Sequence, residues 1–149
     1  NYHERKVTLL NGPHTVLSPV AYLSGVNIVR DACNHPVIGK YVRKVQFDEL
    51  MQTLNLPMDE LKKFAADVLE RFDNPYVEHQ VTSIMLNSFP KYQTRDLPGL
   101  KTYLERKGEL PKGLVLGLAA IINVVVTRAA CVPTALKSLR TTLPKSCNC

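Results

Sequence analysis

Three polar residues near the start of the sequence have the types and the spacing to move a proton. Lys6, Asn11 and His14 follow the pattern K-x4-N-x2-H and stand among apolar residues. A lysine with apolar neighbours can lose enough solvation to accept a proton near neutral pH. An amide and an imidazole a few residues away could hold the oxygen of an alcohol or carbonyl beside it. The pattern therefore predicts acid-base chemistry at an oxygen-bearing carbon.

Each of these residues also has a plainer interpretation. Lys6 alone would be a surface lysine, Asn11 would cap a turn before Gly12 and Pro13, and His14 would be a structural histidine. Their combined spacing favours the chemical interpretation. Three other histidines lack such a context, and we expect them at the surface or in turns: His3, His35 and His79. No metal site is predicted.

Length and composition narrow the class of protein. A chain of 149 residues is large enough for one domain with a real core. The net charge of +6 is concentrated at the end, because residues 123–149 contain four basic residues and no acid. A basic face within the fold is not apparent, so we expect no nucleic-acid partner. No apolar run is long enough to cross a membrane, and the cysteine usage is typical of a cytoplasmic protein.

Apolar spacing predicts an all-α fold that carries these residues. Residues at i, i+3 and i+4 recur along much of the chain, and no pair of strands is convincing. The stripe from Leu61 to Phe72 is the clearest, and we interpret it as core alone. The expected helices cover residues 15–24, 27–32, 37–54, 58–72, 80–88, 90–106 with an interruption at Pro98-Gly99, and 114–122.

Three motifs resemble one known family. Residues 2–15 read YHERKVTLLNGPHT, residues 71–75 read RFDNP, and residues 86–98 contain LNS, Lys91 and RDLP. Over residues 1–122 the chain resembles the C-terminal domain of the mannitol dehydrogenase family, the polyol-specific long-chain dehydrogenases. The likeness is greatest to members that interconvert the sugar acids tagaturonate and altronate. It implies a helical substrate domain whose partner is an N-terminal Rossmann domain that holds most of the NAD cofactor.

The resemblance also implies roles for the residues that match. The implied reaction is metal-independent hydride transfer between NAD and the carbinol of a sugar acid or polyol. Lys6 would be the general acid/base, Asn11 would hydrogen-bond the developing alkoxide, and His14 would orient the substrate oxygen. Lys91 stands where the family has a substrate-binding lysine. Ser83 stands where polyol-specific members have an arginine, and this difference favours another substrate than mannitol.

Lys91 and Arg95 suggest what that substrate carries. They are four residues apart, on one face of an expected helix. Together they could bind the carboxylate of a sugar acid. A solvated basic face is an equally good interpretation of the same spacing.

The last 27 residues differ from the rest. Residues 123–149 contain no Asp, Glu, Gly, Tyr, Phe, Ile or Met, and the resemblance ends before them. Our hypothesis is that a shifted reading frame replaced the true C-terminus. We expect a fragment of an NAD-dependent oxidoreductase that is inactive alone. The alternative is a stand-alone helical interaction module without catalysis.

Overall fold

The structure is a computed structural model that describes residues 2–130, with side chains up to residue 127. Within this part of the chain there is no strand, and an isolated antiparallel bridge joins Ile28 and Gln80. The all-α prediction is confirmed. The elements are α1 (Tyr2–Lys6), the π-helical η1 (Val7–Asn11), α2 (Gly12–Leu23), α3 (Val29–Asn34), α4 (Ile38–Lys44), the π-helical η2 (Val45–Leu50), the 3₁₀ turn η3 (Met51–Thr53), α5 (Met58–Phe72), α6 (Val81–Ile84), α7 (Ser88–Arg95), α8 (Leu97–Lys107) and α9 (Lys112–Ala130).

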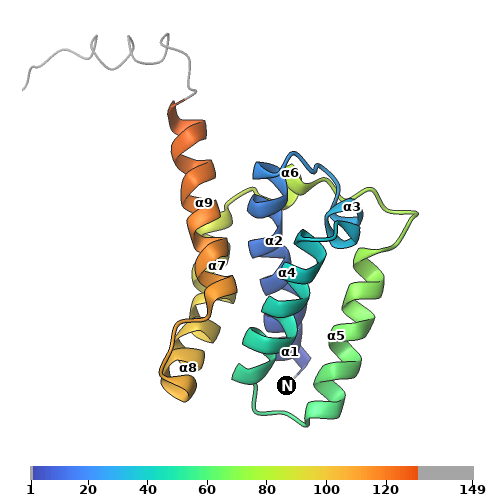
Figure 1. Ribbon diagram of the computed structural model, residues 1–149. Coiled ribbons are helices and arrows are strands. Elements are labelled where there is room, and N and C mark those ends of the chain that lie inside the picture. The colour runs from blue at the N-terminus through green and yellow to red at the C-terminus, as the bar shows by residue number, and fades with distance from the viewer. Residues whose placement is uncertain (1, 131–149) are drawn as a thin grey trace, which may run out of the picture.

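Helix α2 is the centre of the molecule. It lies between α9 on one side and α4 and α5 on the other (Figure 1). Its apolar residues Val16, Leu17 and Ala21 are fully buried and belong to two adjoining core clusters. Helix α9 approaches α2 closely because Gly117 has no side chain there: a Cβ on Gly117 would lie 2.5 Å from the Cβ of Val16. The buried residues of α2 that come after the K-x4-N-x2-H motif thus pack against both core clusters of the domain.

A single proline shapes the helix that carries the motif. Pro13 has no N–H, so it cannot donate to the carbonyl of Leu9 as an α-helix requires, and its ring crowds that carbonyl. The helix widens into the π turn η1, where Gly12 N–H donates to Val7 O. The buried side chain of Gln46 supplies a donor to Leu9 O at 2.8 Å. The chain therefore remains helical from Tyr2 to Leu23.

Several predicted boundaries differ from the structure. The first helix begins at Tyr2 rather than at residue 15, because the π turn accommodates Pro13. The predicted helix over 80–88 is only the short α6, and the last helix continues to Ala130 rather than ending near residue 122. The interruption between α7 and α8 falls at Asp96, because Pro98 is tolerated in the first turn of α8.

The predicted atypical tail is described only in part. Residues 123–130 continue α9, and Val124 is 5% exposed within the second core cluster. Residues 131–149 lie outside the described residues, and the reading-frame hypothesis stays a prediction. None of the helices in the described part is both long and apolar enough to span a bilayer.

Candidate active site

The π turn decides which side of the helix the three motif residues occupy. An α-helix advances about 100° per residue, so Lys6 and Asn11 would point about 140° apart on a regular helix. A π turn has more residues per turn and advances less per residue. Because η1 lies between Lys6 and Asn11, it brings Asn11 round toward the side of Lys6, and His14 follows one turn later.

Lys6 is exposed, which differs from the loss of solvation expected from its apolar neighbours. Within the described residues no hydrogen bond or ion pair occupies its ammonium group. The neighbouring Arg5 packs on α5, where its guanidinium lies 4.7 Å from the ring centroid of Phe64 and 3.6 Å from a carboxylate oxygen of Glu60. Lys6 is therefore available to a ligand on the outer side of this helix.

His14 lies in an apolar setting that keeps it neutral. Its ring stacks on Phe72 with centroids 3.8 Å apart and planes 20° apart. Burial lowers the pKa of His14 to about 4, with further lowering by His79 and then Arg95. Its Nε2 atom is buried and has no hydrogen-bond partner among the described residues. A neutral imidazole with one unoccupied nitrogen can hold a hydroxyl or carbonyl oxygen.

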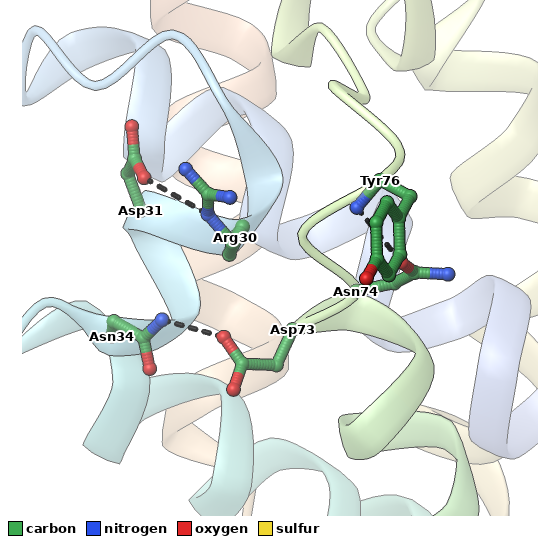
Figure 2. Close-up of polar contacts among 6 residues, drawn as sticks. All are labelled: Arg30, Asp31, Asn34, Asp73, Asn74 and Tyr76. Carbon is green, nitrogen blue, oxygen red and sulfur yellow. Dashed lines mark hydrogen bonds and ion pairs between the residues drawn. The ribbon is translucent and has the colours of Figure 1, made fainter.

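The RFDNP motif places the ring beneath His14. Phe72 ends α5, and Asp73 Oδ1 then accepts a 2.6 Å hydrogen bond from Asn34 Nδ2, which ties the turn to α3 (Figure 2). The Asn74 side chain accepts the Tyr76 backbone N–H at 2.9 Å, an Asx turn also drawn in Figure 2. The prediction of a core stripe is confirmed for Phe72, which is 6% exposed. Its contact with His14 was missed, because only packing brings the two together.

His79 is held near His14 by the antiparallel bridge between Ile28 and Gln80. Backbone hydrogen bonds from Val29 N–H to His79 O and from Val81 N–H to Asn27 O pair the two short segments. The His79 ring then lies edge-on to His14, with centroids 6.2 Å apart. His79 is exposed, as expected, yet it contributes to the electrostatics of His14.

Helix α7 brings two cations to the same region. Asn87 begins it in the left-handed conformation (φ 56°), which Asn tolerates better than most residues. Lys91 Nζ donates to Ile84 O at 2.9 Å, and Arg95 Nη1 donates to Thr15 Oγ1 at 3.3 Å. Burial, and then the charge of Arg95, lower the pKa of Lys91. Both side chains are half-buried, so they differ from a freely solvated face.

Neither cation has an acidic partner in the part of the chain that the structure describes. The ion pairs there are Arg5 with Glu60 and Arg30 with Asp31, the latter drawn in Figure 2. The charge of Arg95 acts on the nearby Asp96 carboxyl, but burial raises the pKa of Asp96 and favours its uncharged form. The two cations repel each other, and an anion between them would relieve that repulsion. The arrangement can therefore bind a small anion.

Asp96 was missed by sequence reasoning. An Asp before Leu97 and Pro98 is typical of a helix N-cap, but its side chain makes no capping hydrogen bond. The carboxyl is instead fully buried against α2, and its oxygens have no partner among the described residues. Burial raises its pKa well above the usual value. A Cβ on Gly12 would lie 2.8 Å from Asp96 Oδ1, so a side chain at position 12 would force the Asp96 carboxyl to move.

A cleft of about 290 Å³ adjoins Arg95 on the side of α1 and α8. Four threonines are among the residues that line it: Thr8, Thr53, Thr94 and Thr102. Lys6, Asn11 and His14 are not among its lining residues. In the described part of the chain, no three His, Cys, Asp or Glu side chains gather as a metal site would require.

Comparison with known proteins decides the family. The family model for the mannitol dehydrogenase C-terminal domain matches residues 1–129. The chain belongs to the mannitol dehydrogenase family. It is 88% identical over 122 residues to altronate oxidoreductase of Bacteroides thetaiotaomicron, and 46% identical over 121 residues to that of Bacillus subtilis. These alignments cover 82% and 81% of the chain but 26% and 25% of the two relatives.

A solved member of the mannitol dehydrogenase family has the same helical arrangement. The ternary complex of Pseudomonas fluorescens mannitol 2-dehydrogenase with NAD and D-mannitol matches with a TM-score of 0.69 at 26% identity. The match covers 80% of this chain and 24% of that one. The chain thus spans about a quarter of the length of its relatives, and the resemblance to the family is confirmed.

Proposed function

We propose that residues 1–122 are the substrate domain of an NAD-dependent oxidoreductase that interconverts altronate and tagaturonate. The observation that carries this proposal is that the chain is 88% identical over 122 residues to an altronate oxidoreductase. The K-x4-N-x2-H motif supports it, because the π turn between Lys6 and Asn11 reduces the angle between these two side chains around the helix axis. Enzymes of this family act on polyols or sugar acids.

Lys6 is proposed as the general base in the direction of alcohol oxidation. In its neutral form it accepts the proton of the reacting hydroxyl and returns it in the reverse direction. The side-chain amide of Asn11 donates a hydrogen bond to the oxygen as negative charge develops on it. His14, held neutral against Phe72, orients the same oxygen through its unoccupied Nε2. NAD would supply the hydride acceptor.

The proposed partner for the substrate carboxylate is the pair Lys91 and Arg95. Arginine binds carboxylates through two parallel N–H groups, and a neighbouring lysine adds charge. Neither cation forms an ion pair with an acid in the described structure. Arg95 lies near His14 and donates to its neighbour Thr15, and Lys91 lies near Arg95. A neutral polyol would leave them uncompensated, so this pair favours a sugar acid over mannitol.

An N-terminal Rossmann domain is proposed to hold most of the cofactor. The exposure of Lys6 supports this, because a group that acts on a substrate between two domains must face outward from each domain alone. The chain by itself is then expected to be inactive in the cytoplasm, because the hydride acceptor would be held mainly by the other domain.

A chimera tests the proposed reaction. The 122 aligned residues of this chain would replace their counterparts in the Bacteroides thetaiotaomicron relative, and NADH formation from altronate would be measured. We expect activity in the chimera. Lys6→Ala should lower kcat by about 10²- to 10⁴-fold, because proton transfer loses its acceptor. The matched control is Lys101→Ala, an exposed lysine on α8.

Two results would contradict the proposed reaction. One is an unreactive chimera that is folded and still binds NADH. The other is a Lys6→Ala variant whose kcat equals that of Lys101→Ala, which would show that the charge at Lys6 takes no part.

A further inference from the structure

One buried hydroxyl joins the two parts of the site. Thr15 is 2% exposed, and its Oγ1 donates to Asn11 O at 2.9 Å. The same oxygen accepts the Arg95 Nη1 hydrogen bond at 3.3 Å, across 80 residues of sequence. This side-chain hydrogen bond joins α7 to α2. The guanidinium is therefore attached to the turn that contains Asn11 and His14.

Because the Thr15 hydroxyl donates its proton to Asn11 O, it can only accept in its hydrogen bond with Arg95. A threonine hydroxyl has one proton, and here the carbonyl four residues earlier takes it. The lone pairs of Oγ1 then face outward as acceptors only. They can bind a donor such as Arg95 but offer no negative charge, so the guanidinium is held in place without being neutralised.

The close approach of the α7–α8 junction reinforces this attachment. Asp96, the next residue after Arg95, is buried directly against Gly12. The backbone at Arg95 therefore cannot retreat from α2. Its guanidinium is also near enough to His14 and Lys91 to lower the pKa of each.

We propose that Thr15 is a positioning residue for substrate specificity: its hydroxyl holds the Arg95 guanidinium beside Lys91 and His14, where the carboxylate of a sugar acid binds. The inference rests on the proposed function, since it assumes that a carboxylate is bound here. It adds a residue that touches neither substrate nor cofactor. Arg95 held in this way has most of its five N–H donors left for an anion.

Two substitutions at one position separate the hydroxyl from the shape of the side chain. In the chimera, Thr15→Val keeps the shape and removes the hydroxyl, whereas Thr15→Ser keeps the hydroxyl. Thr15→Val should raise the KM for altronate about tenfold, in line with the loss of a charge-assisted hydrogen bond, with kcat changed less than twofold. Thr15→Ser should restore the KM to within about twofold of the unsubstituted chimera. Equal KM values in the two variants, or a loss confined to kcat, would overturn the proposal.

A second measurement separates this inference from the proposed reaction. In the 149-residue chain, an NMR titration follows the His14 ring. If Thr15 holds Arg95 near His14, Thr15→Val should raise the pKa of His14 and Thr15→Ser should leave it near that of the unsubstituted chain. If the His14 pKa rises in Thr15→Val but not in Thr15→Ser while the chimera is inactive, the proposed reaction is refuted and the positioning role of Thr15 is not. An unchanged His14 titration in Thr15→Val would refute the positioning role.

Discussion

At the scale of single residues, the site depends on how packing alters ordinary side chains. His14 is neutral because a phenyl ring covers one of its faces and two cationic or ionisable neighbours oppose its charge. Burial and then the charge of Arg95 lower the pKa of Lys91, and burial raises the pKa of Asp96. Each shift favours the uncharged form. For His14 and Asp96, this leaves the cations Lys91 and Arg95 as the groups that offer charge to an anion.

His14 predicts a pH-dependent stability. Between pH 6.5 and 4, the unfolded chain protonates His14 while the folded chain does not, so the unfolded state binds more protons. The free energy of unfolding should therefore fall as the pH falls through this range, by up to about 3 kcal/mol from this residue. Urea unfolding at several pH values would measure it in the unsubstituted chain and in His14→Gln.

The control for that measurement is His3→Gln, because His3 is exposed on α1. The stability advantage of the unsubstituted chain over His14→Gln should shrink from pH 7 to pH 4, while His3→Gln follows the unsubstituted chain. A constant difference between the unsubstituted chain and His14→Gln would contradict a lowered pKa for His14.

At the scale of elements, the π turn is the device that arranges the motif. A regular helix would separate Lys6 from Asn11, and Pro13 makes a regular helix unfavourable at this point. Gln46 then compensates the Leu9 carbonyl from η2, itself a π-helical segment. The π turn η1 therefore costs little stability, because the carbonyl that Pro13 leaves without a backbone donor accepts a hydrogen bond from Gln46.

The link between Pro13 and Gln46 can be measured with a double-mutant cycle. Gln46→Met removes the donor to Leu9 O, and Pro13→Ala supplies a backbone N–H in its place. We expect Gln46→Met to be less destabilising in the Pro13→Ala chain, with a coupling energy of about 1 kcal/mol. Chemical unfolding of the four proteins gives this value. Additive effects would mean that the proline and the glutamine act independently.

At the scale of the whole molecule, the packing of α9 on α2 completes the core behind the site. Gly117 and Gly113 let α9 lie close to Val16 and to Glu49, whose carboxylate accepts the N–H groups of Gly113 and Leu114 at 2.7 and 2.8 Å. A buried carboxylate at a helix N-terminus satisfies donors that would otherwise be unpaired. Helix α9 is therefore fixed at its start by Glu49 and along its length by α2.

Gly117→Ala tests this packing. The added Cβ would overlap Val16, and overpacking of this kind costs about 1–3 kcal/mol. The higher helix propensity of alanine offsets about 1 kcal/mol at most. Thermal or urea unfolding should thus show a net loss of stability. Val115→Ala, at an exposed position on α9, should change the unfolding free energy by less than about 0.5 kcal/mol. Equal stability of the two variants would argue against close α2–α9 contact.

The sequence by itself determined the fold class, the main helices and the motif. Apolar residues recur at helical spacing regardless of what they pack against, and the spacing of Lys6, Asn11 and His14 is a property of one continuous segment. Helix ends were less accurate, because the π turn before Pro13 and the burial of Asp96 against Gly12 depend on partners distant in sequence. Local patterns could not show that Gln46 would compensate the proline.

Only the tertiary structure decided what surrounds the motif. Phe72 beneath His14, Arg95 on Thr15 and Asp96 against Gly12 each join segments far apart in the sequence. Burial and electrostatics depend on which surfaces meet, and a one-dimensional pattern does not contain that information. For this reason the residues capable of chemistry could be found from the sequence, whereas their solvation, pKa shifts and mutual orientation could not.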